Sequence, residues 1–190
     1  MTIPTADEAL ERLKQGHQRI RDGRARGAGR VGSLKEELIG RQEPFAIVLS
    51  CSDSRVPTEI LFDTRFGDVF VIRVAGNVAN PSSIASVEYA VQYIGTKLIV
   101  VMAHQNCGAV DAAIDGSDAG KNLNTLLSYI KPAMDPPGAD ADEIARRNAR
   151  NSAERLISES DIIRNATENG GVKIVTAFFH FDDGAVEFDS

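Results

Sequence analysis

Two short segments of this sequence contain side chains that could bind a metal ion together. Cys51 is followed by Asp53 and Arg55, and His104 stands three residues before Cys107. Two thiolates and one imidazole suit Zn²⁺, and three protein ligands leave the fourth position of a tetrahedral zinc ion open. The two segments therefore predict a zinc site with room for a water molecule or a substrate.

Each of these residues also has an ordinary explanation when it is taken alone. A single cysteine is usually a small buried residue, a single histidine is usually hydrogen-bonded, and Asp53 with Arg55 can be a simple ion pair near a turn. A disulfide between Cys51 and Cys107 is a competing use of the thiols, and it would leave His104 unexplained. The zinc prediction therefore depends on whether the fold brings the two segments together.

The elements that must position these residues are two apolar strands. Residues 45–50 and 98–102 are continuous apolar runs that end directly before Cys51 and shortly before His104. Two further runs have the same character, residues 69–73 and 172–178. Such strands indicate a parallel sheet covered on both faces, and functional groups gather at the carboxyl ends of its strands. If the first two strands are neighbours, the three ligands meet at one edge of the sheet.

Helical patterns alternate with these strands. A capping box of Thr5 and Glu8 begins a helix that Gly23 ends. The other helical segments that we predict are residues 82–94, 122–134, 142–157 with an extension to 165, and a short helix that ends at Gly40 after a second capping box, Ser33 with Glu36.

This order of elements predicts an α/β fold with a central, mostly parallel sheet flanked by helices. Asp183-Gly184 is a hairpin signal after the last strand, so we expect an antiparallel strand to close the sheet. We expect a single domain over residues 1–190, in which residues 1–40 form an N-terminal helical arm.

The composition disfavours several classes of function. The chain has 21 Lys and Arg against 27 Asp and Glu, a net charge of −6, so we expect no general affinity for nucleic acid or for an anionic membrane. No apolar run approaches the length of a membrane span, and the polar residues 1–22 do not resemble a signal peptide. We therefore expect a cytoplasmic protein. A nucleotide-binding domain is disfavoured because no glycine-rich phosphate loop follows the first strand.

Five short motifs in this sequence resemble those of the β-class carbonic anhydrases. In chain order they are "CSDSRV", "GDVFVIR", "AGN", "SVEYAV" and "HQNCGAV", and the similarity runs from about Leu34 to Ile114. The resemblance implies an enzyme that hydrates carbon dioxide reversibly to bicarbonate and a proton, with Zn²⁺ as its cofactor.

The resemblance also implies a role for each matching residue. Cys51, His104 and Cys107 match the zinc ligands. Asp53 and Arg55 match a dyad in which Asp53 accepts a hydrogen bond from the nucleophile while Arg55 holds it away from the metal; in a closed state of such sites, Asp53 becomes the fourth ligand. The residues that match the substrate pocket of the plant-like subgroup are Gln42, Phe70, Tyr89 and Gly108.

In such enzymes the substrate pocket is shared across a dimer interface, and the N-terminal helix packs on the partner. The resemblance therefore implies a homodimer or a higher homo-oligomer. The ordinary explanation for Phe70 and Tyr89 is core packing, and it stays open at this point.

The sequence departs from the family pattern without losing a ligand. Val74 stands where Asn is common, Ala103 stands where Gly is common, and Phe179-His180-Phe181 occupies a region where a Gly and a Tyr are usual. Two alternatives to carbon dioxide hydration remain: a zinc-binding structural or regulatory homologue without turnover, and a related hydrolase of COS or CS₂.

Overall fold

The structure, a computed structural model, describes residues 3–27 and 37–189. The described residues form a five-stranded sheet with the strand order β2-β1-β3-β4-β5. β1, β2, β3 and β4 run parallel, and β5 pairs antiparallel with β4. This arrangement confirms the predicted fold class. The strands are β1 (Ala46–Ser50), β2 (Val69–Arg73), β3 (Leu98–His104), β4 (Lys173–Phe179) and β5 (Val186–Phe188).

The central strands are buried along their whole length, as their continuous apolar sequences predict. Every residue of β1 and β3 is buried, whereas β2, at one edge of the sheet, is only half-buried in this chain. The register pairs Ser50 with Arg73 and with Met102. The carboxyl ends of β1, β2 and β3 therefore lie together at one edge of the sheet.

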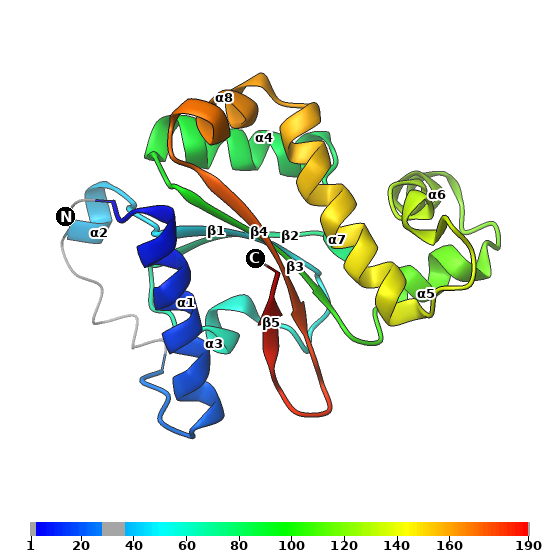
Figure 1. Cartoon of the computed structure of the whole chain (residues 1–190), viewed down its shortest axis with the longest axis horizontal. Helices are drawn as coiled ribbons and strands as arrows, with labels where there is room; N and C mark the ends of the chain where they lie inside the picture. The colour runs from blue at the N-terminus through cyan, green and yellow to red at the C-terminus, as the bar shows by residue number, and fades with distance from the viewer. Residues whose placement is uncertain (1–2, 28–36, 190) are drawn as a thin grey trace.

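Helices cover both faces of the sheet (Figure 1). α4 (Pro81–Tyr89), α7 (Ala141–Ser158) and α8 (Asp161–Asn169) lie on one face, and α1 (Ala6–Arg21) with α3 (Thr58–Leu61) lies on the other. α5 (Gly108–Asp115) and α6 (Lys121–Ser128) follow the carboxyl end of β3. A four-residue helix, α2 (Glu37–Gly40), precedes β1. Among the described residues, none of the helices has both the length and the apolar character of a bilayer span.

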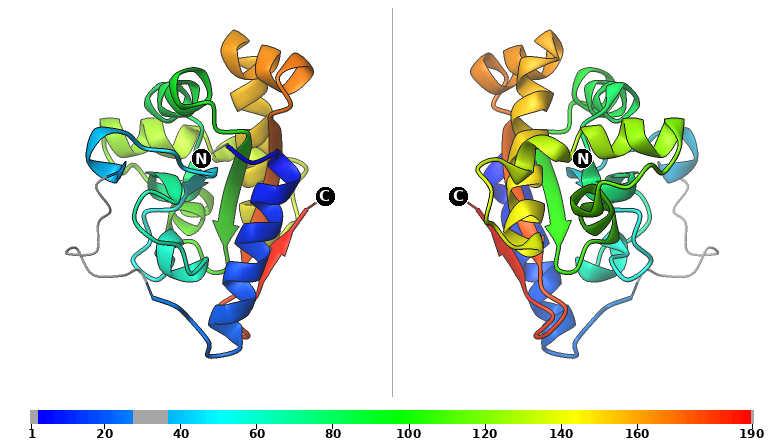
Figure 2. Two further views of the ribbon diagram at one scale, coloured as in Figure 1. Left: turned by 90° about the vertical axis from the view of Figure 1, so that its left-hand side faces the viewer. Right: turned by 90° about the vertical axis from the view of Figure 1, so that its right-hand side faces the viewer.

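α1 begins as predicted and packs differently from the prediction. Thr5 and Glu8 form the reciprocal capping box. The sequence led us to expect that the apolar side of this helix lies on a second subunit. Instead, Ala9 and Leu13 are fully buried against the chain's own sheet, and His17 accepts a hydrogen bond from the Val186 N–H of β5. Figure 2 shows α1 running beside β5. This side of α1 belongs to the core of its own chain.

Three predicted helices have other boundaries in the structure. The segment 82–94 is α4 followed by a π-helical turn, Ala90–Ile94. The segment 122–134 is interrupted, because α6 ends at Ser128 and a 3₁₀ turn, Lys131–Met134, contains Pro132. α7 does not extend to residue 165, because Ser160 caps the separate helix α8. α3 and α5 were not predicted, and the capping box of Ser33 and Glu36 lies outside the described residues.

Candidate metal centre

The three predicted ligands meet at the carboxyl edge of the sheet. Cys51 is the first residue after β1, His104 is the last residue of the neighbouring strand β3, and Cys107 precedes the first turn of α5. All three are buried, and their ligand atoms lie within 4.8 Å of one another. Both cysteines are free, so the competing disulfide is not formed.

The donor set fits Zn²⁺. An ideal tetrahedral site with Zn–S bonds of about 2.3 Å separates its two sulfurs by about 3.8 Å, which is compatible with the observed cluster. His104 Nδ1 lies 2.8 Å from Gln105 O, and this contact requires the ring proton on Nδ1. His104 Nε2 is buried and has no hydrogen-bond partner among the described residues. An unpartnered lone pair that faces two thiols is the arrangement that a metal ligand needs.

The surroundings of the thiols favour negative charge. Gly76 N donates a hydrogen bond to Cys51 Sγ at a distance of 3.3 Å. The hydrogen bond between the two thiol groups lowers the pKa of Cys51 and raises the pKa of Cys107. Backbone N–H groups of the first turn of α5 oppose that rise. The pair therefore gives up one of its two protons readily, and a cation between the sulfurs would favour loss of the other.

Asp53 is held beside this cluster by Arg55. Arg55 Nε donates to Asp53 Oδ1 over 3.0 Å, and Arg55 Nη2 donates to Oδ2 over 2.7 Å. The Arg55 backbone N–H also donates to Oδ1. These hydrogen bonds hold the pKa of Asp53 well below its usual range. Oδ2 lies 3.9 Å from His104 Nε2, so the ionised carboxylate faces the ligand cluster.

Three further residues fix the loops of this centre, and the sequence did not assign them a role. Arg73, at the end of β2, donates through Nε to Cys51 O and through Nη2 to Asp53 O. Asp142, in the first turn of α7, accepts from the Asn106 N–H. Asn106 has a left-handed φ of 51° and accepts from Arg55 through its carbonyl. The position of Arg73 at a strand end beside the cysteine strand was the available signal.

Phe181 lies where the sequence departs from the family pattern. Its ring makes an edge contact with the His104 ring, at a centroid distance of 5.6 Å. The Arg55 guanidinium lies over the same ring, 4.3 Å from its centroid. The Phe181 N–H donates to Gln105 Oε1. This aromatic ring therefore packs against both a candidate ligand and the arginine that holds Asp53.

The other two departures are accommodated by the sheet. Ala103 is buried and is paired with Phe178 of β4. Val74 N donates to Ser50 O and so continues the pairing of β2 with β1 by one residue. Neither residue prevents the three ligand side chains from meeting.

The residues predicted for the substrate pocket do not all join this cluster within one chain. Gln42 is exposed and precedes β1, whereas Cys51 follows it. Phe70 pairs with Ile47, four residues before Cys51, which is about 13 Å along a strand. The structure therefore places Gln42 and Phe70 away from the ligands of their own chain. Gly108, by contrast, directly follows Cys107, and a Cβ atom there would meet nothing within 4 Å apart from its chain neighbours and its own helix backbone.

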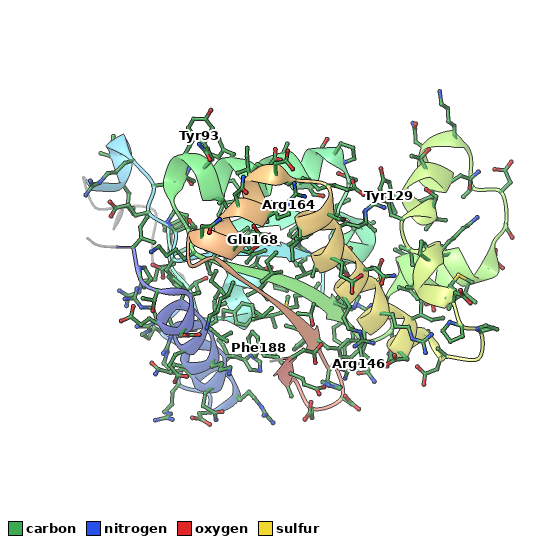
Figure 3. The ribbon with its side chains drawn as sticks, turned by 45° about the horizontal axis from the view of Figure 1, so that its top comes forward. Tyr93, Tyr129, Arg146, Arg164, Glu168 and Phe188 are labelled. Atoms are coloured by element: carbon green, nitrogen blue, oxygen red, sulfur yellow. The ribbon has the colours of Figure 1, made fainter. Side chains whose placement is uncertain are left out.

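Phe70 and Tyr89 belong to an aromatic surface at the β2 edge of the sheet. Their ring centroids are 6.2 Å apart, and the ring of Tyr93 lies 5.5 Å from that of Tyr89. Tyr89 is 48% exposed and Tyr93 is 79% exposed. Figure 3 shows Tyr93 on the outer side of the helical layer. Because about half of the Tyr89 side chain is exposed, core packing within one chain does not explain why an aromatic residue stands at this position.

The family model and the relatives that this chain matches in sequence are all carbonic anhydrases. A sequence model of the carbonic anhydrase family matches residues 46–186. The chain is 34% identical to carbonic anhydrase 2 of Mycobacterium tuberculosis, across 96% of this chain and 91% of the relative. It is 46% identical to a carbonic anhydrase of Pseudomonas aeruginosa, across 81% of this chain and 77% of the relative.

Solved structures with the same fold are also similar. One of two tetrameric β-carbonic anhydrases from Sordaria macrospora superimposes with a TM-score of 0.74 at 24% identity, and the match covers 96% of this chain and 94% of that one. The β-carbonic anhydrase CcaA superimposes with a TM-score of 0.72 at 26% identity, over 95% of this chain and 87% of the other.

Proposed function

The chain belongs to the β-carbonic anhydrase family and so catalyses the reversible hydration of carbon dioxide, and we propose that it does this with Zn²⁺ held by Cys51, His104 and Cys107. The observation that carries the proposal is the buried cluster of two thiols and an unpartnered histidine nitrogen, with ligand atoms within 4.8 Å of one another. When bound there, Zn²⁺ lowers the pKa of a water ligand from about 15.7 towards about 7 and supplies hydroxide near neutral pH.

Asp53 orients the nucleophile in this proposal. Its ionised carboxylate can only accept hydrogen bonds, and Oδ2 faces the ligand cluster. A hydroxyl group that donates to Oδ2 must turn a lone pair elsewhere, and carbon dioxide approaches from that side. Asp53 therefore contributes by fixing the direction of attack rather than by moving a proton.

Arg55 keeps Asp53 in the acceptor position. The fork of two N–H groups matches both carboxylate oxygens, which is a geometry that lysine cannot reproduce. For Asp53 to become a metal ligand itself, this fork would have to open. We therefore propose that at pH 8 the metal site is mainly open, with Asp53 paired to Arg55. The closed metal site, in which Asp53 leaves Arg55 and becomes the fourth ligand, is a minor state.

The substrate pocket in this proposal is completed by a second copy of the chain. Gln42 would donate a hydrogen bond to a bicarbonate oxygen, and Phe70 with Tyr89 would form the apolar wall that accepts carbon dioxide. These three residues lie on surfaces that are open in one chain, away from its own ligands. Gly108 leaves room beside Cys107. We propose a homodimer or a larger assembly built on it, with residues 1–190 as one domain.

Stopped-flow measurement of carbon dioxide hydration by the zinc-loaded protein tests this function. We expect about one zinc ion per chain, from one three-ligand site, and turnover that a chelator abolishes. A zinc-bound protein without turnover would support the structural or regulatory alternative. The Asp53–Arg55 fork favours the enzyme, because a structural zinc site does not need it. Parallel assays with COS and CS₂ separate the related hydrolase.

A further inference from the structure

The loop beside Cys51 is held in place by a residue that lies 72 positions after Gly76 in the sequence. Asn148, in α7, donates from Nδ2 to Gly76 O over 2.7 Å. Gly76 N in turn donates to Cys51 Sγ over 3.3 Å. We propose that Asn148 is a positioning residue for the metal centre, which acts on the Cys51 sulfur through Gly76. This inference rests on the proposed zinc site.

Asn148 is an unexpected residue at its position in α7. It is 1% exposed, and its buried neighbours on the helix are the apolar residues Ile144, Ala145 and Ala149 and one small polar residue, Ser152. An alanine or a leucine would cover the sheet here without the cost of burying an amide. Among the described residues, Oδ1 of Asn148 has no hydrogen-bond partner, so the bond from Nδ2 to the Gly76 carbonyl is what explains the asparagine. Because Nδ2 faces a carbonyl oxygen, the orientation of the amide is also fixed.

Gly76 needs to be held, because its backbone adopts a conformation that few residues favour. Its φ is 69°, and Asn77 beside it is also left-handed with φ 45°. A Cβ atom on Gly76 would lie 2.7 Å from Ile130 Cδ1, so the position is closely packed as well. A loop with two successive left-handed residues keeps its shape only when its surroundings impose it. The Asn148 amide is one such contact, and it fixes the residue that carries the N–H donor to sulfur.

The hydrogen bond to Cys51 Sγ matters most when the sulfur is a thiolate. A directed N–H group stabilises the negative charge and fixes the orientation of a sulfur ligand. Without Asn148, the Gly76 peptide is free to turn, and the sulfur loses a donor that is aligned in advance. Groups that contact a metal ligand directly change metal affinity by about 10- to 100-fold. Asn148 acts one step further away, so we expect about a tenfold effect.

Ser152 supplies a matched control on the same helix. It lies one turn after Asn148, is also buried, and accepts a hydrogen bond from the Ala79 N–H at the far end of the same loop. Ser152→Ala therefore removes one bond between α7 and the loop and leaves the bond to Gly76 in place. A general loosening of the loop would affect both variants equally, whereas the proposed role concerns Asn148 alone.

The experiment measures Zn²⁺ affinity by chelator competition and the thiolate-to-metal charge-transfer band of the Cd²⁺-substituted protein. For Asn148→Ala we expect about tenfold weaker Zn²⁺ binding and a band shifted to longer wavelength, because a thiolate without its N–H donor is more easily oxidised. Ser152→Ala should match wild type in both measurements. If Asn148→Ala does not fold, Asn148→Thr, whose hydroxyl is too short to reach Gly76, is measured in the same way.

The inference is overturned if the Asn148 and Ser152 variants change both readouts equally, or if neither differs from wild type. Its failure is distinguishable from failure of the proposed function. If the wild-type protein binds no Zn²⁺, the proposed function itself fails. If wild type binds Zn²⁺ and the Asn148 variant binds it equally well with an unchanged band, only the positioning role of Asn148 is lost.

Discussion

The predicted site has two parts, the metal ligands and the substrate wall, and they lie in different regions of the molecule. A single chain provides a larger share of the first part than of the second. At the carboxyl ends of β1 and β3, Cys51, His104 and Cys107 are buried together, and loop contacts surround them. At the β2 edge, Phe70 and Tyr89 form a surface that is partly exposed, and among the described residues β2 pairs with a strand on one side only. One chain by itself brings the three candidate ligands together, whereas it leaves the aromatic side chains proposed for the substrate wall partly exposed.

The largest effect should come from removing a ligand. We expect Cys107→Ser to lose most of its zinc and its turnover, because a neutral hydroxyl is a much weaker ligand for Zn²⁺ than a thiolate. The loss of affinity should exceed the roughly 100-fold upper range for residues that only contact ligands. Metal analysis after dialysis, together with stopped-flow assay, checks this. Full zinc retention would show that the ligand assignment is wrong.

The next largest effect concerns Arg55, which lies beside the metal ligands and is not itself a ligand. Arg55→Ala should reduce turnover by about 10- to 100-fold and leave zinc bound, because Asp53 is then free to leave its acceptor position. Arg164→Ala is the matched control, since Arg164 also pairs with an aspartate, Asp161, but on α8 (Figure 3). Kinetics and metal content of both variants decide the question. Turnover near that of wild type in Arg55→Ala would remove Arg55 from the mechanism.

A third experiment tests whether the outer region serves a second chain. Gln42→Ala should lower kcat/KM by up to about tenfold, because it removes one hydrogen bond to substrate. Chains with Gln42→Ala are then mixed with chains that carry Cys107→Ser and allowed to re-associate. If Gln42 serves the partner's zinc, each mixed dimer contains one intact site, and the mixture should recover about a quarter of wild-type activity. Activity that stays near a twentieth would place Gln42 in the site of its own chain.

The same comparison explains how far the sequence alone could lead. The ligands follow from local rules, since Cys51 and His104 stand at the ends of apolar runs whose parallel pairing is expected. The packing partner of α1 could not be predicted in this way. An apolar stripe shows that one side of a helix is buried, but it does not show whether the same chain or another chain buries it. Arg73 and Asn148 make contacts with residues 20 and 72 positions away, and although Arg73 stands at a strand end, no local pattern identifies the partners of either residue.

The smallest expected effect is a pH dependence at the ligand region. We expect activity to rise severalfold from pH 7 to pH 9. Asp53 itself does not cause the rise, and the sign of its pKa shift shows why. Hydrogen bonds from Arg55 lower the pKa of Asp53, so the carboxylate stays ionised over this range, and its contribution is lost only when the pH falls through that lowered pKa. The rise must therefore come from hydroxide, which competes better for the metal as pH increases.

An ionised Asp53 remains available as a competing ligand at the lower end of that range. Zinc X-ray absorption at low and high pH, on wild type and Asp53→Asn, separates the possibilities. We expect the coordination shell and the activity of wild type to change together, while the shell of Asp53→Asn stays constant, because an amide competes poorly for Zn²⁺. Flat wild-type activity would mean that the switch is absent. A coordination shell that changes with pH in both proteins would mean that a group other than Asp53 replaces hydroxide. Asp53 of the wild type would then stay paired with Arg55 over the whole pH range.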